Sequence, residues 1–361
     1  MEDLGTRLLV KVAQLYHVQG LNQDQIGRQL GVSRSKVSRM LKEARERGLV
    51  EISIHYPARF SLDLERQLEA DLGLREAVVV NAGGVAGSQV LSAVAGAASD
   101  YLLRVLRPGD MLGVSGGETV ALTVQMMPAS TVERVSVVQL GTGVAYVGEW
   151  IAFSSVKAAL QLAQKLGGMD RLVLVPIPSL LDDETIRDSL LRDTGVRRAM
   201  DLLASCTVAL VGIGAGEAIS RASGAAAPAN GAGASPNGQR GQQRKLSPFT
   251  EDEVTELREA GAVGEICTRF FDVRGRPCVT SLNRRMVGLD LGQFRAVPLV
   301  IGVASGPRKA AAIIGAARGG YVKSLVTDDV TASEVLALAR STSDGGRSTE
   351  TTNGIGLPPG R

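Results

Sequence analysis

The chain has 361 residues, of which 44% are hydrophobic and 21% are charged, and its 40 basic side chains nearly balance its 37 acidic ones. This length and composition are typical of a globular protein of about two domains, and they exclude a wholly disordered or collagen-like chain. The 3 cysteines form no close pair, and there are only 2 histidines. The sequence therefore predicts no disulfide framework, no metal site and no cofactor, and a reducing compartment fits it best.

The hydropathy pattern supports neither a signal peptide nor a membrane-spanning segment. The first twenty residues carry charged and polar side chains throughout and contain no apolar stretch leading to a cleavage site, unlike a signal peptide. The longest weakly polar run, from Leu202 to Gly216, is about 15 residues, whereas a bilayer span needs about 20. We therefore expect a soluble cytoplasmic protein with no membrane partner.

Residues 1–57 are expected to form a winged helix-turn-helix DNA-binding domain. Apolar residues at helical spacing predict a first helix, and Asn22 is placed to cap a second. Gly31 is expected to end that helix, and Ser33 to cap a third. Residues 49–54 then alternate between apolar and polar side chains, which predicts the strand of a wing.

Basic residues concentrate where the third helix is predicted, with seven between positions 28 and 47 against two acidic ones. Such a local excess suits the neutralisation of DNA phosphates, although a solvated basic helix face is the alternative. Arginine and serine can bond base edges from the start of a recognition helix, whereas lysines more often contact phosphates. The predicted DNA-binding residues are Arg28, Ser33, Arg34, Ser35, Lys36, Ser38, Arg39 and Lys42.

A linker helix is expected within residues 58–76, because leucines recur at near-helical spacing over 60–72. Packing on its own domain is the favoured role, and a dimer contact is the alternative. From 77 to 340, short apolar runs alternate with helical patterns, which predicts an α/β domain with a mostly parallel sheet covered on both faces. The predicted strands are Ala77–Asn81, Met111–Val114, Val135–Leu140, Leu172–Pro176, Val208–Gly212, Leu299–Ala304 and Ser324–Thr327.

Two segments are expected to lie outside any core. The stretch at 222–245 is rich in Gly, Ala, Ser and Gln, with no acidic residue between Ala222 and Arg244, and predicts a disordered insertion in the second domain. Its basic end could approach DNA, but a tolerated surface insertion is the favoured interpretation. The tail at 341–361 is similarly polar and is also expected to be unstructured.

Three glycine-rich turns follow predicted strands and precede predicted helices, at positions 115–119, 141–143 and 305–309. Glycines let backbone amides approach an anion closely, and the following helix N-terminus adds partial positive charge, so the turns suit a phosphate. Ordinary strand-to-helix connections are the alternative for any one turn. The predicted effector-binding residues are Ser115, Gly116, Gly117, Glu118, Thr119, Gly141, Thr142, Gly143, Ser305, Gly306 and Lys309, with Asp272 expected to bind sugar hydroxyls.

The sequence offers little for catalysis. Both histidines lie in the first domain, so no Ser–His or Cys–His pair can be proposed in the second. The cysteines are expected to pack as small hydrophobic residues. The glycines at 212–216 lack the spacing of a dinucleotide-binding turn, and Trp150 is expected in the core near the mouth of the site.

The chain resembles the SorC-type sugar-binding transcriptional regulators of bacteria. The resemblance extends from Leu8 to about Ala339 and is carried by LNQDQIGRQLGVSRSKVSRMLKEARERGLVEI, GDMLGVSGGETV, GEICTRFFDVRGRPC and VIGVASGPRKAAAIIGAARGGYVKSLVTDDVTA. It implies a winged helix-turn-helix joined to a Rossmann-like effector domain similar to the sugar-phosphate isomerase and deaminase fold. It also implies homo-dimers or homo-tetramers, with the three turns as effector loops and the third holding a phosphate. The second loop, Gly141-Thr142-Gly143, and the insertion depart from the family pattern and leave the sugar open.

The sequence as a whole predicts a transcriptional regulator of carbohydrate or nucleoside catabolism genes that binds double-stranded operator DNA under the control of a phosphorylated sugar. An enzyme is not expected. The alternative is a sugar-phosphate isomerase or deaminase tethered to DNA, which the fold likeness permits because fold does not dictate function. A third interpretation is a structural nucleic-acid-binding protein with a vestigial pocket.

Overall fold

The computed structural model describes residues 4–50, 60–84, 87–129, 132–141, 154–175, 177–215 and 249–344. By its internal contacts the chain divides into two units, Met1–Pro57 and Ala58–Arg361. Several sequence predictions fall outside the described residues: most of the wing at 49–54, the insertion at 222–245, and Thr142, Gly143 and Trp150.

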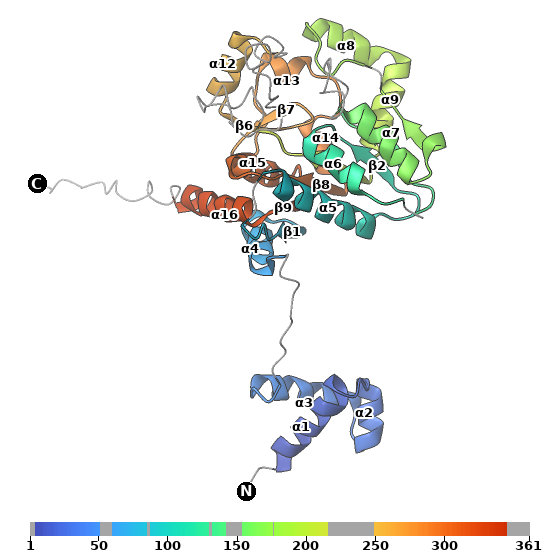
Figure 1. The fold of residues 1–361 in the computed structure, drawn as a ribbon, viewed down its shortest axis with the longest axis vertical. Helices are drawn as coiled ribbons and strands as arrows, with labels where there is room; N and C mark the ends of the chain where they lie inside the picture. Colours follow the sequence, from blue (N-terminus) through green and yellow to red (C-terminus); the bar gives the residue numbers. More distant parts are fainter. Residues whose placement is uncertain are drawn as a thin grey trace, which may run out of the picture. The chain divides into compact units, whose positions relative to one another are not determined.

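The first unit is a small three-helix domain (Figure 1). Its helices are α1 (Leu4–His17), α2 (Gln23–Leu30) and α3 (Arg34–Glu46). Its core is built from the apolar faces of all three helices, namely Val12, Leu15, Ile26, Val37 and Leu41. Val12 and Leu15 are three residues apart in α1, and Val37 and Leu41 are four apart in α3, so one stripe of each of these helices is buried.

The turn between α2 and α3 has the capping chemistry that the sequence predicts. Asn22 and Gln25 form a reciprocal capping box at the start of α2, and Gly31 ends that helix in the left-handed region at φ 66°. Ser33 starts α3 by accepting a hydrogen bond from the backbone N–H of Lys36 at 3.3 Å. A Cβ at Gly27 would lie 2.7 Å from the Val32 carbonyl oxygen, so only glycine permits this close approach.

We predict that Ser33→Ala will lower the free energy of unfolding of the first unit by about 0.5–2 kcal/mol, because the N-terminal amides of α3 lose their side-chain acceptor. Urea unfolding of the full chain, followed by helical circular dichroism, measures the change. Ser33→Asp keeps an acceptor and should remain close to the native stability. Equal losses in the two variants would show that the cap contributes nothing.

The second unit is built on one parallel sheet whose strand order is β1-β9-β8-β5-β2-β3-β4. The predicted strands are confirmed, with shifts of at most one residue at their ends, apart from the run at 172–176, which pairs over two residues only. The strands are β1 (Glu76–Val80), β2 (Met111–Val114), β3 (Ser136–Gln139), β4 (Leu172–Val173), β5 (Val208–Gly212), β8 (Leu299–Val303) and β9 (Ser324–Asp328).

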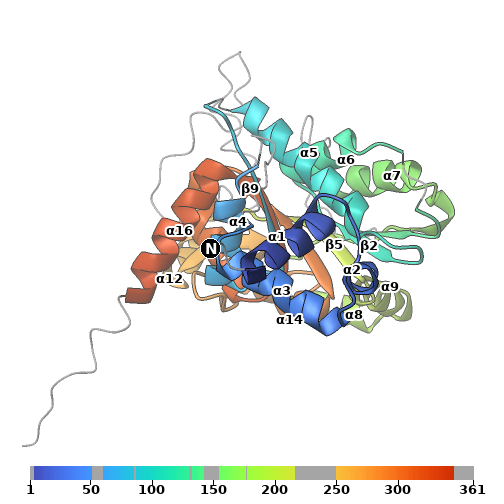
Figure 2. The ribbon, with the colours of Figure 1, turned by 90° about the horizontal axis from the view of Figure 1, so that it is seen from below.

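Helices cover both faces of this sheet, in keeping with its nearly continuous apolar strands. One face packs against α5 (Ser88–Val105), α6 (Glu118–Met126) and α7 (Ser155–Lys165). The other packs against α4 (Leu62–Leu72), α9 (Thr194–Ala204), α14 (Leu291–Ala296), α15 (Ala310–Arg318) and α16 (Asp329–Asp344). Figure 2 shows α5, α6 and α7 on one side of the strands and α4 and α16 on the other. The predicted α/β class with a Rossmann-like layering is confirmed.

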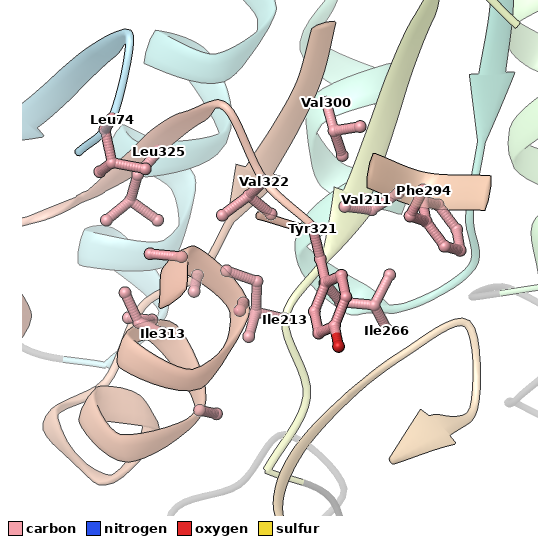
Figure 3. Packing of buried hydrophobic residues seen from close by; sticks show 14 of the residues in the cluster. Leu74, Val211, Ile213, Ile266, Phe294, Val300, Ile313, Tyr321, Val322 and Leu325 are labelled. Atoms are coloured by element: carbon pink, nitrogen blue, oxygen red, sulfur yellow. The ribbon is translucent and has the colours of Figure 1, made fainter. Parts of the chain in front are cut away.

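Tyr321 is the largest fully buried side chain of the described residues. It packs on the face of the sheet that α15 and α16 cover, where it lies beside Ile213 and Ile266 (Figure 3). Its hydroxyl donates to the Gly275 carbonyl at 2.6 Å, and the Arg295 guanidinium lies over its ring at 5.3 Å. A buried phenol is therefore fully satisfied, which is what permits its burial.

The helix expected as a linker, α4, is part of the core of the second unit. Leu68 is completely buried there, and Leu72 nearly so. The carboxylates of Glu65 and Glu69 accept hydrogen bonds from the backbone N–H groups of Val79 and Ala77, at 2.8 and 2.9 Å. Since β1 is an edge strand, α4 covers an edge that would otherwise present unpaired amides.

The sequence missed an antiparallel hairpin of β6 (Ala262–Ile266) and β7 (Arg269–Asp272). The expectation that residue 341 begins an unstructured tail is wrong, because α16 continues to Asp344. The hydroxyls of Ser341 and Thr342 donate to the Leu338 and Ala339 carbonyls, so these polar residues are accommodated in the last turn. Shorter elements complete the unit: η2 (Met169–Arg171), α8 (Glu184–Arg192), α12 (Glu251–Glu259), α13 (Ser281–Arg285) and η4 (Pro307–Lys309).

Within the described residues, no helix combines the length and the apolar character that a bilayer crossing would need.

Candidate functional site

The predicted DNA-binding residues lie on the exposed surface of the first unit, from Arg28 in the last turn of α2 to Lys42 in the third turn of α3. All eight are exposed, whereas Val37 and Leu41 on the opposite side of α3 are buried. Two of them already interact: the hydroxyls of Ser33 and Ser35 lie 3.0 Å apart. The structure therefore presents these side chains to solvent, and their contact with base edges and phosphates stays a prediction.

An open groove of about 630 Å³ runs beside this surface. The side chains of Arg28 and Arg34 line it together with Asp24, whose carboxylate lies 3.8 Å from the Arg34 guanidinium. Both partners are mostly exposed, so the pair contributes little to stability.

A second site follows from the strand order of the sheet. Strands β2 and β5 are neighbours, but the chain leaves β2 toward β3 and leaves β5 toward β8, in opposite directions. The connections that follow them therefore diverge at the carboxyl ends of the strands, which makes this point a topological switch point. Ligands of open α/β sheets bind at such a switch point.

The first and third predicted turns enter this region with the same backbone geometry. Gly117 has φ 112° immediately before α6, and Gly306 has φ 111° immediately before η4. Only glycine adopts this conformation without strain, and no atom lies within 4 Å of where a Cβ would stand at either position. Each turn thus delivers a helical N-terminus to the carboxyl edge of the sheet with an open backbone.

The serines of these turns form internal hydrogen bonds. Ser115, which is buried, accepts a hydrogen bond from the Gly212 N–H at 3.1 Å and donates to the Gly116 carbonyl at 3.0 Å, so it ties β2 to β5. Ser305 donates to the Asp328 carboxylate at 2.7 Å. The structure therefore assigns both hydroxyls to holding the loops.

Lys309 is the charged group of the third turn and is partly buried at the end of η4. Burial lowers the pKa of its ammonium group, and the negative charges of Glu265, Glu118 and Asp328 oppose that shift. Burial in turn raises the pKa of Glu118, while the Lys309 charge lowers it. Lys309 and Glu118 come from two different turns, and the charge of each affects the pKa of the other.

Glu265, on β6, belongs to the same cluster and was missed by the sequence analysis. Its backbone pairs with Gly214, just beyond β5, with both N–H···O distances at 2.9 Å. A carboxylate oxygen accepts from the Thr268 N–H at 2.7 Å. Burial raises its pKa, and the Thr268 hydrogen bond and Lys309 lower it. Burial alternates along β6 in the structure, but its sequence AVGEI does not alternate between apolar and polar residues, so the sequence carried no clear strand signal.

The hairpin turn at Cys267 and Thr268 adopts positive φ values of 49° and 63°. A β-branched residue in the left-handed region is strained, and such strain gathers at functional sites. A Cβ at Gly141 would lie 3.7 Å from the Cys267 Sγ, so the described part of the second predicted turn meets this hairpin.

Asp272 does not join these residues. It lies at the end of β7 away from the Cys267–Thr268 turn. Its carboxylate accepts hydrogen bonds from the backbone N–H groups of Arg274 and Arg276, at 2.9 and 2.8 Å, and from the Arg276 side chain at 2.8 Å. The structure thus commits Asp272 to closing a turn.

The cysteines have the character of packed thiols. Burial raises the pKa of Cys206 to about 12 and that of Cys278 to about 11, and it also raises the pKa of Cys267. Each is therefore a neutral thiol near pH 7, the form that is a poor nucleophile.

We predict that the native chain loses more stability than Glu265→Gln as the pH rises from about 4.5 to about 7.5. The folded chain holds the Glu265 proton more tightly than the unfolded chain, because the folded pKa lies above the ordinary 4.5. This contribution is present at low pH and is lost as the pH rises through the folded pKa. Urea unfolding across this range tests it, with exposed Glu259→Gln as the control. Parallel curves for all three proteins would contradict the burial of this carboxyl group.

Comparison with known proteins assigns the chain to a family. A family model described as "Putative sugar-binding domain" matches residues 56–227 and 233–337, and one described as "Sigma-70, region 4" matches 11–47. The sorbitol operon regulator of Klebsiella pneumoniae is 32% identical over 334 residues, which cover 91% of this chain and 98% of the relative. The chain belongs to the SorC family of sugar-binding transcriptional regulators.

Other SorC-type relatives agree over the same length. The deoxyribonucleoside regulator of Bacillus subtilis is 30% identical over 92% of this chain and 98% of its own. The crystal structure of the full-length SorC protein from Klebsiella pneumoniae superimposes with a TM-score of 0.63 at 32% identity, covering 92% of this chain and 99% of that one. The resemblance inferred from the sequence motifs is therefore confirmed, as is the pairing of a helix-turn-helix with an α/β sugar-binding domain.

Proposed function

We propose that this protein is a DNA-binding transcriptional regulator of carbohydrate or nucleoside catabolism genes, and that a phosphorylated sugar controls it. The observation that carries the proposal is the placement of Lys309 and two open glycine turns at the switch point of the sheet, in a chain that also presents a cationic recognition helix. Two relatives support the proposal by their names, which are sorbitol operon regulator and deoxyribonucleoside regulator.

Double-stranded operator DNA is the proposed macromolecular partner, and this partner places the activity in the cytoplasm. The exposed residues of α3 would enter the major groove, with arginines on base edges and lysines on phosphates. We further propose a homo-dimer or homo-tetramer, because a two-fold assembly would hold two recognition helices at half-sites about 34–36 Å apart or a multiple of it.

We propose that cationic groups of the site bind the phosphate of the effector and that the site's carboxyl groups bind the sugar. The phosphate would lie against Lys309 and the helix N-termini behind Gly117 and Gly306, where its negative charge would favour the ammonium form of Lys309. The carboxyl groups of Glu118 and Glu265 would accept hydrogen bonds from sugar hydroxyls. This arrangement recognises both ends of a sugar phosphate.

We propose binding, without turnover, as the activity of this site. The relatives compared above are named as regulators. The thiols beside the site are neutral, and the serines are committed to the loops.

A thermal-shift screen against phosphorylated and unphosphorylated sugars tests the proposal, because a ligand of the native state raises the apparent melting temperature by mass action. Active phosphorylated sugars should then change operator affinity in a gel-shift assay, by the factor that a coupling energy of about 1–3 kcal/mol allows. A chain that binds its operator equally with and without every sugar phosphate would contradict it, and so would release of a converted sugar.

A further inference from the structure

Two buried polar residues at the end of β9 and just after it, Asp328 and Thr331, form hydrogen bonds to the third turn. Asp328, the last residue of β9, is only 2% exposed. Its carboxylate accepts three hydrogen bonds: from the Thr331 N–H at 2.8 Å, the Thr331 hydroxyl at 2.7 Å and the Ser305 hydroxyl at 2.7 Å. A buried carboxylate is tolerated when hydrogen bonds replace its hydration, as they do here.

Thr331 is fully buried, and its hydroxyl both donates and accepts a hydrogen bond. It donates to Asp328 and accepts a hydrogen bond from the backbone N–H of Gly306 at 2.8 Å. Because the carboxylate can only accept, the direction of each bond is fixed. The orientation of the Gly306 peptide, three residues before Lys309, therefore depends on a single hydroxyl group.

These contacts reach two consecutive residues of the turn, Ser305 through its side chain and Gly306 through its backbone. Gly306 has the φ of 111° that starts η4, and the Lys309 N–H in turn donates to the Gly306 carbonyl at 3.0 Å. Glycine in an open turn has many alternative conformations. The hydrogen bonds of Ser305 and Gly306 select one of these conformations and thereby fix the position of the Lys309 backbone.

Thr331 also lies in the first turn of α16, which packs against α4. Leu336 of α16 and Leu68 of α4 belong to one buried cluster, and the Arg340 side chain donates to Gln67 at 2.7 Å. The helix that follows the DNA-binding unit in the chain is thus in direct contact with the helix that holds the third turn.

We propose that Asp328 and Thr331 are positioning residues for the effector: they fix the turn at 305–309 in its anion-binding conformation and join it, through α16, to α4. The inference rests on the proposed function, because it assumes that this turn receives the phosphate. It adds two residues that need not touch the ligand.

The test compares Thr331→Val, which keeps the shape but removes the hydroxyl, with Thr331→Ser, which keeps it. Ser333→Ala, on the exposed side of the same helix, is the control because its hydroxyl bonds only the Asp329 carbonyl. We measure inorganic phosphate affinity by competition thermal shift and hydrogen exchange of the Gly306 amide. Thr331→Val should weaken phosphate binding about tenfold and speed this exchange by a similar factor, because it removes both the acceptor of the Gly306 N–H and the donor to Asp328. Thr331→Ser and Ser333→Ala should match the native chain.

Unchanged Gly306 exchange in Thr331→Val overturns the proposal, as does native phosphate affinity in that variant. If Thr331→Val does not fold, Asp328→Asn serves instead, because it removes the negative charge that orients the same hydroxyl. If the native chain binds no phosphate, the proposed effector class fails, and the exchange of Gly306 still decides whether the pair positions the turn.

Discussion

Replacing Lys309 with methionine should abolish the response to a phosphorylated sugar while leaving operator affinity without sugar near its native value. Lys309 is partly buried, and its charge affects the pKa of Glu118 in the first turn. Removing one partner of a buried charged contact costs about 2–5 kcal/mol, which corresponds to at least thirtyfold in Kd. Isothermal titration with a sugar phosphate identified by the thermal-shift screen measures the loss, and a gel shift measures operator affinity.

The matched control is Lys323→Met. Lys323 precedes β9, so it lies at the opposite end of the sheet, where its ammonium group donates to the Gly320 carbonyl at 2.8 Å. This variant should bind the same sugar phosphate with native affinity. If Lys309→Met bound the ligand as tightly as Lys323→Met does, the phosphate would have to be bound elsewhere.

The double variant Arg34→Ala, Arg39→Ala should lose most discrimination between operator and unrelated DNA. Both side chains are exposed on α3, and Arg34 stands at its first position. Each arginine that bonds guanine bidentately contributes about 1–3 kcal/mol of discrimination, so the pair together should account for a large share of it. Fluorescence anisotropy with operator and scrambled duplexes at matched salt measures the ratio.

Lys42→Ala supplies the contrast, because its ammonium group is exposed 3.7 Å from Glu46 and is expected on a phosphate. It should weaken binding to both duplexes equally and reduce the salt slope by about 0.9, the value for one phosphate contact. Native discrimination in the double arginine variant would mean that a different surface reads the bases.

The sequence predicts those features that local chemistry controls. The caps Asn22 and Ser33 and the left-handed Gly31 are fixed by hydrogen bonds within a few residues, so their patterns are legible. Strand β5 was predicted to the residue, because Val208–Gly212 is apolar on both faces and ends in glycine. The open turns at Gly117 and Gly306 were recognisable for the same reason.

Contacts between distant segments could not be predicted in this way. Lys309 affects the pKa of Glu265 because the hairpin pairs with Gly214. No residue pattern near either segment predicts that pairing. From the sequence alone, the hydroxyl of Ser305 could as well have bound a ligand. Only the fold shows that it donates a hydrogen bond to Asp328. Asp272 accepts hydrogen bonds from residues two and four positions ahead in its own turn, a local role that the sequence analysis did not weigh when it assigned the carboxylate to sugar hydroxyls.

The burial of α4 against β1 and α16 bears on how this regulator could be recombined with others. A chimera that exchanged the recognition module at residue 77 would discard Leu68 and leave Leu325 and Leu336 exposed to water. A crossover placed ahead of Ser61 would keep α4 together with the second unit, whose hydrophobic core includes Leu68. Swapped sensors joined there should retain the thermal stability of their parent, whereas those joined at residue 77 should aggregate.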